Sequence, residues 1–572
     1  RDAKKPKWDT PAVIVLDRTV TRVFPTGARL TLTHNIIRVQ DKDAIDKFGE
    51  VQIPPDADLL TLRAIKADGT TREPEEVAEK DTISVPDLEP GDYVEFEYVD
   101  PAAPPGAFPR GFLAERFFFR SYDAPLYRSE YVVAAPPDMK LQVDRRGEGV
   151  PQMRVDHARD LAIYTFATTL QPQLFAEPSS TPFAEFLPSV RVASGLSTQA
   201  WKDYLLDGQL LAGRANRELT RLAAEITREA HGDADKVRAV DGWVRRHVKG
   251  GGGALDEGAT SILAREEGNR ITLESALLAA AGVPSRIWLA HPPRDAQLDG
   301  ALPDLEGFDE PLLAAAGLWL DPRYRHAPTG FVSPPLRGGR AFALAPGKLE
   351  GARVPTGNPD DRQMDFDVKL AADGSAEVSV RETLRGWPAL EWREALEKLA
   401  ADRVQPEFEQ HTLGFHFPGA SLISLQWQGK DDDAGPFTVA YRFRAPQLAR
   451  RVGRALVLPA PFPAELGKRY IGVARRTTPL YVDYAPPTHV HARIAVPERM
   501  VAALPPPVRA EAPFGLFEQA ASSDGGAGAV VLDARFAMSD ARLPAADYRS
   551  IVEFAQRVDR AEAKALEIRP SK

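Results

Sequence analysis

Apolar and polar residues alternate with a period of two along much of residues 12–166, and this alternation predicts β-strands. The pattern is clear in residues 30–39 and 93–98, and turn-forming pairs such as Asp68-Gly69 separate its segments. Strands of this length, joined by short turns, are typical of two packed sheets. We therefore predict an N-terminal antiparallel β-sandwich over residues 10–175.

Helical spacing begins near Trp201. Apolar residues recur at intervals of three and four over residues 219–230 and again over residues 237–248, which predicts two amphipathic helices. A short apolar helix follows the Gly268 turn, and two buried strands come after it. This order predicts an α+β domain over residues 200–345.

The chain returns to a strand pattern from Met364 onward, and further β-rich domains are predicted over residues 360–540. Apolar residues at helical spacing in the last segment, beginning at Tyr548, predict a C-terminal helix over residues 544–568. The fold class predicted for the whole chain is therefore multidomain and β-rich, with one α+β domain. A chain of 572 residues is also too long for one core and is expected to divide into about three to five domains.

Charge and composition exclude several classes of function. The net charge is −9, from 72 basic and 81 acidic residues that are interspersed, so we expect no nucleic-acid partner. No apolar run approaches the length of a membrane span, and we predict none. The chain begins at Arg1 and not at Met. We expect that a segment has been removed, either a signal peptide or a larger upstream region.

The chain contains no cysteine. This excludes disulfides, thiolate metal sites and thiol nucleophiles together. Cysteine avoidance fits an exported protein, and we expect an extracytoplasmic location, in the periplasm or at the cell surface.

Several motifs resemble a known bacterial architecture. Residues 276–286 read Ala-Leu-Leu-Ala-Ala-Ala-Gly-Val-Pro-Ser-Arg, similar to the Ala-Leu-Leu-x-x-x-Gly-Ile-Pro-Ala-Arg pattern of the transglutaminase-like family in the papain-like superfamily. Residues 318–322, Leu-Trp-Leu-Asp-Pro, match the end of that domain. Residues 88–96 and Phe117-Phe-Phe119 resemble the uncharacterised β domain that precedes it in bacterial proteins. The resemblance implies a papain-like fold for residues 205–345.

The same resemblance locates a catalytic triad whose chemistry is missing. The family places a Cys nucleophile at a helix start, where this chain has Arg270 or, in an ungapped alignment, Glu267. Glu310 stands at the His position, and Asp321 keeps the acidic position. Arginine has no lone pair to offer and glutamate is not a thiol, so the family's reaction is not expected. We predict no catalytic residues and interpret Arg270, Glu310 and Asp321 as degenerate triad positions.

Two arrangements are open for these remnants. Arg270 could form a buried ion pair with Glu310 or Asp321, holding the geometry of the former site. Alternatively, Arg270 at a helix start could bind a carboxylate ligand. The residues expected to line such a cleft are Glu267, Trp288, Trp319 and Tyr324.

The sequence gives little indication of another nucleophile or of a metal site. Thr272 and Ser275 lie on the same predicted helix as Arg270, but His291 and His326, the nearest bases, follow strands and are expected in loops. His489 and His491 would share one face of a strand, whereas His411 and His416 are five apart and share neither a helix nor a strand face. Neither pair has an identifiable third ligand. We therefore predict no metal and no cofactor.

The sequence leaves three functions open. The first is a non-catalytic, extracytoplasmic binding or scaffold module, with a protein, a peptide or a cell-wall fragment as partner. The second is an active amide or ester hydrolase, or an acyltransferase, that uses Glu310 and Asp321 in a mechanism without cysteine. The third is a structural subunit of a cell-envelope complex. The sequence favours the first.

Overall fold

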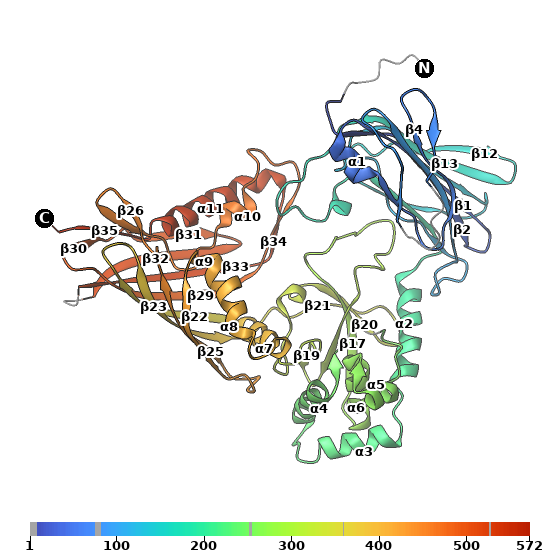
Figure 1. The fold of residues 1–572 in the computed structure, drawn as a ribbon. Coiled ribbons are helices and arrows are strands. Elements are labelled where there is room, and N and C mark those ends of the chain that lie inside the picture. The colour runs from blue at the N-terminus through green and yellow to red at the C-terminus, as the bar shows by residue number, and fades with distance from the viewer. Residues whose placement is uncertain (1–7, 75–81, 251–253, 358–359, 525–527, 572) are drawn as a thin grey trace. The chain divides into compact units, whose positions relative to one another are not determined.

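The protein is described by a computed structural model that covers residues 8–74, 82–250, 254–357, 360–524 and 528–571 (Figure 1). The chain divides into two compact units. One contains residues 1–176, 182–205 and 296–307, and the other contains residues 177–181, 206–295 and 308–572. Both are rich in strands, as the sequence predicts for a multidomain β-rich chain.

The first unit is built on an eight-stranded sheet with the order β12-β13-β10-β1-β2-β7-β4-β5. Strands β1 and β10 run parallel, so the expectation of a purely antiparallel domain is wrong at this pair. The other neighbouring strands are antiparallel. The strands are β1 (Ala12–Val23), β2 (Arg29–Val39), β4 (Asp58–Ile65), β5 (Thr71–Arg72), β7 (Tyr93–Ala102), β10 (Leu126–Ala135), β12 (Arg154–Ala158) and β13 (Leu161–Gln171).

A second sheet covers part of the first. Buried side chains of both sheets, among them Tyr131 and Phe166 from one and Phe112 and Val190 from the other, form a common core. Its strand β14 lies beyond residue 175, the predicted end of the N-terminal domain. This sheet comprises β8 (Phe112–Leu113), β9 (Phe117–Phe118), β11 (Gln142–Arg146) and β14 (Ser189–Ser194).

A short helix that the sequence did not predict packs beside the first sheet. Helix α1 (Lys42–Phe48) begins at Asp41, whose side chain accepts a hydrogen bond from the Ala44 amide at 2.9 Å. Strands β3 (Glu50–Gln52) and β6 (Thr82–Ser84) pair next to it.

The second unit opens with what we call the central region, helices α3–α6 and an antiparallel five-stranded sheet of order β19-β18-β17-β20-β21. Helix α6 contacts α3, α4 and α5 as well as the sheet, so it lies in the middle of this region. The helices are α2 (Thr198–Ala212), which leads into the region, α3 (Arg217–Ile226), α4 (Asp233–His247), α5 (Ala259–Arg265) and α6 (Arg270–Ala280). The strands are β15 (Lys249–Gly250), β16 (Glu267–Gly268), β17 (Ser285–His291), β18 (Glu310–Ala315), β19 (Leu318–Leu320), β20 (Arg340–Leu344) and β21 (Gly351–Arg353).

The C-terminal region is built on a second eight-stranded sheet, with the order β24-β25-β23-β22-β29-β33-β32-β31. Along β22, buried Met364, Phe366 and Val368 alternate with exposed polar residues, so one face of the sheet is apolar and the other is polar. Its strands are β22 (Asp361–Leu370), β23 (Ala376–Arg385), β24 (Ser421–Gln428), β25 (Phe437–Ala445), β29 (Ala485–Ala495), β31 (Val508–Ala512), β32 (Gly515–Asp524) and β33 (Ala529–Met538).

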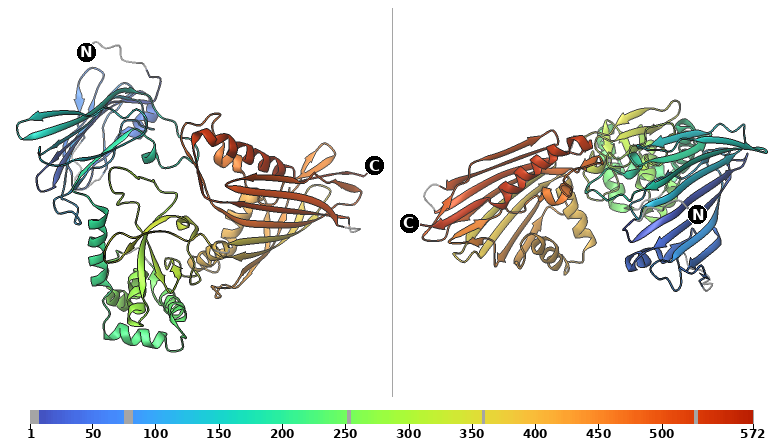
Figure 2. Two further views of the ribbon diagram at one scale, coloured as in Figure 1. Left: turned by 180° about the vertical axis from the view of Figure 1, so that it is seen from behind. Right: turned by 90° about the horizontal axis from the view of Figure 1, so that it is seen from above.

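Helices and a small sheet cover the apolar face, as Figure 2 shows for α11. The predicted C-terminal helix is present as α11, and the residues after it form strand β35, which pairs with β27 and β30. The covering elements are α7 (Trp387–Lys398), α8 (Val404–Glu407), α9 (Gly414–His416), α10 (Leu466–Tyr470), α11 (Tyr548–Ala563), β26 (Arg450–Val452), β27 (Ala455–Leu458), β30 (Met500–Ala503) and β35 (Leu566–Pro570). Strands β28 (Leu480–Val482) and β34 (Ala541–Leu543) pair with each other.

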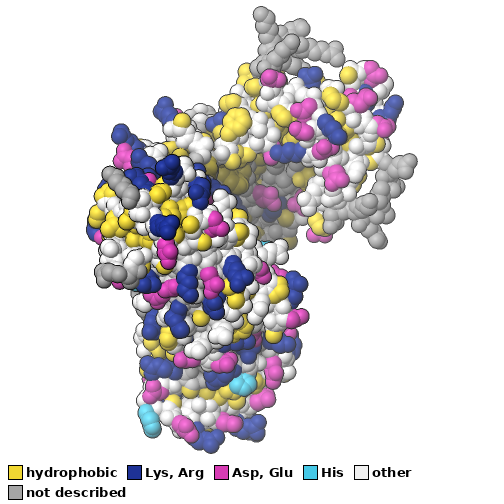
Figure 3. Space-filling model, turned by 60° about the vertical axis from the view of Figure 1, so that its left-hand side comes forward, with side chains coloured by type: hydrophobic (Ala, Val, Ile, Leu, Met, Phe, Trp, Pro, Cys, Tyr) yellow, Lys and Arg dark blue, Asp and Glu magenta, His cyan; other side chains and the backbone are white. Residues whose placement is uncertain are grey.

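The surface is mixed in charge. On the face drawn in Figure 3, basic and acidic side chains are interspersed, with apolar side chains between them. Among the described residues, no helix has both the length and the apolar character that a membrane crossing requires.

Candidate functional site

The start of α6 lies at the centre of the predicted site. The side chain of Asn269 accepts a hydrogen bond from the Ile271 amide at 3.0 Å and caps the helix, so Arg270 is its first residue. Gly268 precedes this cap with a φ of 135°, and a Cβ there would lie 2.6 Å from the carboxylate of Glu257. Glu267 is exposed on the short strand β16. Arg270, and not Glu267, therefore occupies the helix start.

Arg270 does not form the predicted ion pair with Glu310 or Asp321. Its Nε donates to the carbonyl of Val248 at 2.8 Å, and its Nη1 donates to the carbonyls of Pro322 and Arg323 at 3.0 and 3.1 Å. Burial lowers the pKa of Arg270 to about 10. The side chain is only 6% exposed, so these carbonyls replace water as partners of the guanidinium.

Arg323, which the sequence did not single out, joins the two acidic positions. Its Nε and Nη2 donate to the two carboxylate oxygens of Asp321 at 2.7 and 2.8 Å, and its Nη1 donates to Glu310. The Nη2 also donates to the hydroxyl of Ser333 at 2.9 Å. We call Arg323, Asp321 and Glu310 the arginine clamp. The predicted acidic positions are thus brought together, but a different arginine pairs with them.

The pKa values of the two acids in the clamp are shifted in opposite directions. Burial would raise the pKa of Asp321, but hydrogen bonds from Arg323 and Ser333 outweigh it and hold that pKa below its usual value. Burial raises the pKa of Glu310, and the nearby Arg323 only partly offsets this. The side chain of Asp321 is 0% exposed, whereas Arg323 and Glu310 are each 32% exposed. Asp321 is therefore an anion that its hydrogen-bond partners stabilise in place of water.

A second group of charges lies behind the clamp. Asp241 on α4 accepts from the Nε of Arg245 at 2.6 Å and from the hydroxyl of Thr329. Arg245 also donates to the carbonyl of Asp321 at 3.2 Å. Glu274 on α6 is fully buried, and neither carboxyl oxygen has a hydrogen-bond partner among the residues that the structure describes. Burial, together with the nearby Asp241, raises the pKa of Glu274 well above its usual value.

The sequence carries a pattern that predicts this group. Asp241 and Arg245 interrupt the apolar stripe of α4, at positions where the helix turns its side chains toward the core. Arg270 and Glu274 are likewise four apart, on a helix that is mostly buried. Charged residues are seldom buried unless they are paired, so their position on the buried face of a helix indicates a polar network.

The aromatic residues expected to line a cleft belong to packed cores. Trp288 is buried and lies against Trp319, with ring centroids 5.2 Å apart. Tyr324 packs edge-on against Trp387. These three side chains contribute to stability in the central region, and the expectation that they surround a ligand is not supported by their packing.

The candidate alternative nucleophiles also lack a base. The hydroxyl of Thr272 donates to the carbonyl of Leu255 at 3.4 Å, and that of Ser275 lies 3.4 Å from the hydroxyl of Ser285. His291 contacts the carbonyl of Pro292 at 3.1 Å. His326 lies between two carboxylates, with Nδ1 2.9 Å from Asp433 and Nε2 2.6 Å from Glu397. Neither histidine is paired with either hydroxyl in these contacts.

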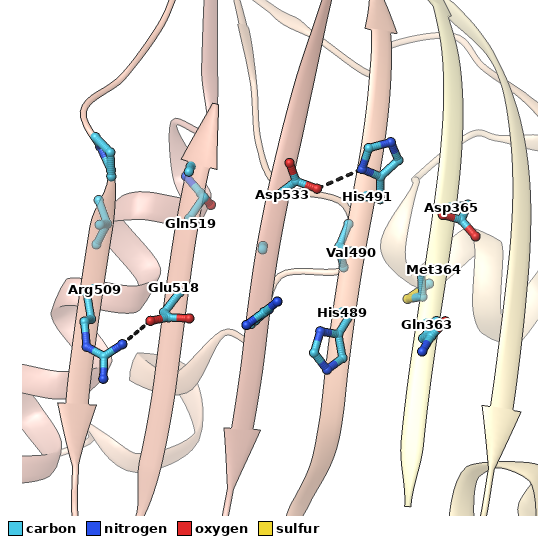
Figure 4. Close-up of a pocket in the computed structure, with 15 residues that line it drawn as sticks. Gln363, Met364, Asp365, His489, Val490, His491, Arg509, Glu518, Gln519 and Asp533 are labelled. Atoms are coloured by element: carbon cyan, nitrogen blue, oxygen red, sulfur yellow. Dashed lines mark hydrogen bonds and ion pairs between the residues drawn. The ribbon is translucent and has the colours of Figure 1, made fainter. Parts of the chain in front are cut away.

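The polar face of the C-terminal sheet contains a cavity of about 610 Å³, which we call the polar hollow (Figure 4). His489 and His491 project into it from β29, as their spacing predicts. His491 contacts Asp533 at 2.8 Å, and Arg509 pairs with Glu518. Among the described residues, no group of three or more metal-ligating side chains is placed to hold a metal ion.

Comparisons with known proteins support the architecture. Residues 26–174 match the model of a family described as a domain of unknown function with a solved structure, DUF3857. The chain is also similar to a crystal structure titled a "putative protease" from Parabacteroides distasonis, with a TM-score of 0.62 and 13% identity. That similarity covers 98% of this chain and 99% of the other, and at this identity it shows the fold alone. No curated protein matches the chain.

Proposed function

We propose that this chain is a non-catalytic binding module that retains a degenerate transglutaminase-like core and acts outside the cytoplasm. The arginine clamp is the observation that carries the proposal. In a papain-like reaction, a base must accept a proton from a nucleophile and an acid must orient that base. Here the helix start holds Arg270, and Arg323 donates to both Glu310 and Asp321.

The polar hollow is the binding site that this proposal favours. Its lining carries both signs of charge, with Arg509 and Arg535 as cations and Asp365, Glu518 and Asp533 as anions. These side chains come from neighbouring strands and form rows across the sheet, as Figure 4 illustrates. A volume of about 610 Å³ lies within the usual range of ligand pockets. A peptide, which carries charged groups of both signs at fixed spacing, complements this surface.

A retention experiment tests the proposal. A library of random hexapeptides with free ends is passed over the immobilised full chain, and the retained peptides are identified by mass spectrometry. Ala520 projects from β32 into the hollow, and A520L should reduce retention about tenfold by occupying its space. A534L is the matched control: Ala534 also borders the hollow, but it alternates with exposed Asp533 and Arg535, so its side chain faces the opposite side of the sheet. No retention by the unmodified chain, or equal retention by A520L, would refute peptide binding at the hollow.

An active hydrolase or acyltransferase is the second candidate, and the raised pKa of Glu310 favours it. A carboxyl whose pKa is raised by burial is suited to general acid or base work near neutral pH. Such an enzyme would have to release Glu310 from Arg323 when substrate binds. Turnover of amide or ester substrates that is lost in E310Q would support this candidate over the binding module.

A further inference from the structure

The apolar face of the C-terminal sheet holds a cavity that none of the functions above uses. Its volume is about 230 Å³, and we call it the inner cavity. Met364, Val490 and Ala534 from three neighbouring strands form its floor. The segment 460–464 and Glu562 of α11 lie on the other side. The inner cavity therefore lies between the sheet and its covering layer.

A second cavity, of about 190 Å³, adjoins the first, and we call it the tail cavity. Ala460 and Pro461 line both. The tail cavity is mostly apolar, with Phe366, Val368 and Ile494 from the sheet among its lining residues. An apolar cavity of about 150 Å³ is enough to bind benzene, and ligand pockets span about 300–1,000 Å³. The two cavities together reach that range.

The inner cavity has a polar end that lacks a partner. Gln519 is 5% exposed and donates from Nε2 to the carbonyl of Ala561 at 3.4 Å, but its Oε1 is buried without a hydrogen bond. A buried acceptor left unsatisfied costs about 1–3 kcal/mol. Glu562 is 6% exposed and accepts a hydrogen bond from the Ala464 amide at 2.9 Å. Both side chains line the cavity and offer acceptor oxygens to whatever occupies it.

The charges around this end favour an uncharged ligand head. Arg362 lines the cavity, but its Nε and Nη2 are bonded to Glu382 at 2.9 and 2.8 Å, so it is already neutralised. Arg535 alternates with Ala534 along β33 and is exposed on the polar face. Burial raises the pKa of Glu562 to about 7. An anionic head would lie beside a carboxyl group, and the two described arginines that line the cavity are either paired, as Arg362 is, or exposed on the polar face, as Arg535 is, which disfavours fatty acids.

We propose that the C-terminal region binds an aliphatic chain that ends in an uncharged hydrogen-bond donor, such as a hydroxyl or an amide N–H. The donor satisfies Oε1 of Gln519, and the chain extends past Pro461 into the tail cavity. The inner cavity and the polar hollow border the same strands, and Met364, Val490 and Gln519 line both. Because Met364 and Gln519 are buried and alternate with more exposed neighbours, the inner cavity lies on the opposite face of the sheet from the polar hollow. The inference therefore stands or falls independently of peptide binding.

Calorimetric titration of the full chain with 1-octanol tests the inference, with sodium octanoate as the comparison at pH 8. We expect saturable binding of one 1-octanol, and an affinity about tenfold higher than for octanoate. A534L, which adds three carbons to the cavity floor, should weaken 1-octanol binding about tenfold, whereas A520L on the polar face should leave it unchanged.

Several results would overturn the inference. These are the absence of saturable binding, tighter binding of octanoate than of 1-octanol, and equal affinities in A534L and the unmodified chain. If circular dichroism shows that A534L does not fold, Q519L takes its place. Q519L removes the unsatisfied acceptor, and it should abolish the preference for 1-octanol over octanoate if the head group lies where we propose.

Discussion

Arg323 donates two hydrogen bonds to the carboxylate of Asp321, at 2.7 and 2.8 Å, in the parallel arrangement that arginine forms with carboxylates. The same guanidinium donates to Glu310. In the resemblance on which the site was predicted, Glu310 and Asp321 stand at the positions of a catalytic base and its orienting acid. The clamp therefore makes these two predicted acidic positions partners of one cation.

Removal of the cation should destabilise the central region. Asp321 is 0% exposed, so R323A would leave a buried carboxylate without its main partner. Breaking a buried ion pair costs about 3–5 kcal/mol, and we expect a loss of about 3 kcal/mol because Arg323 is itself partly exposed. Denaturant titration of the full chain, followed by circular dichroism, measures the change.

The matched control for R323A is R286A. Arg286 also pairs with a carboxylate, that of Glu350 at 2.7 Å, but both side chains are solvent-exposed, at 43% and 55%. Exposed pairs contribute about 0–1 kcal/mol, so R286A should change the free energy of unfolding little. Equal effects of R323A and R286A would mean that the clamp does not hold Asp321 as described.

Glu274 should make stability fall as pH rises. Its folded-state pKa lies well above the ordinary value of 4.5, so the folded chain holds this proton more tightly than the unfolded chain. The stabilisation is complete below about pH 4.5 and is lost progressively as pH rises toward the raised pKa. E274Q removes this dependence, so its melting temperature relative to the unmodified chain should be higher at pH 8 than at pH 5.

E267Q provides the control for E274Q, since Glu267 is an exposed glutamate of the same region. Its effect on the melting temperature should be small and similar at both pH values. A melting-temperature difference for E274Q that does not grow with pH would contradict a raised pKa of Glu274 in the folded chain.

His326 should also make the stability of the folded chain fall as pH rises. Its hydrogen bond to Asp433, followed by that to Glu397, raises its pKa above the ordinary 6.5. A raised histidine pKa stabilises the folded state fully below about pH 6.5, and this stabilisation is lost as pH rises through the folded-state value. Between pH 6 and pH 9, the unmodified chain should therefore lose more stability than H326N.

H231N serves as the control for H326N because His231 is exposed. Melting temperatures of the three proteins across the range from pH 6 to pH 9 make the comparison. If H326N and the unmodified chain show parallel pH profiles, the two carboxylates do not bind a protonated His326.

Much of the fold could be predicted because burial follows the periodicity of the sequence. The stripe at Tyr548, Ile551 and Val558 predicted α11, and these residues are buried as expected. Strand β35 was missed because its short, partly charged segment follows the helix without a turn of its own, and only pairing with β27 and β30 defines it. Parallel pairing of β1 with β10 is likewise a long-range property, which local alternation does not encode.

The sequence indicates where the helix starts, but it does not indicate which arginine pairs with which acid. The Asn269 cap and the Gly268 turn fix the helix start at Arg270, and both are visible in the sequence. Which arginine pairs with which acid depends on the path of residues 321–323, where Asp321 and Arg323 come to lie on the same side. Residues two apart in an irregular segment give no periodic pattern from which that pairing could be derived.

Turnover of amide and ester substrates by the full chain distinguishes a binding module from an enzyme. A panel of p-nitroanilide and p-nitrophenyl ester substrates would be followed at pH 6, 7 and 8, with E310Q and D321N measured in parallel. We expect the unmodified chain to show no turnover above that of the two variants at any of these pH values. Turnover by the unmodified chain that either substitution abolishes would contradict a non-catalytic core.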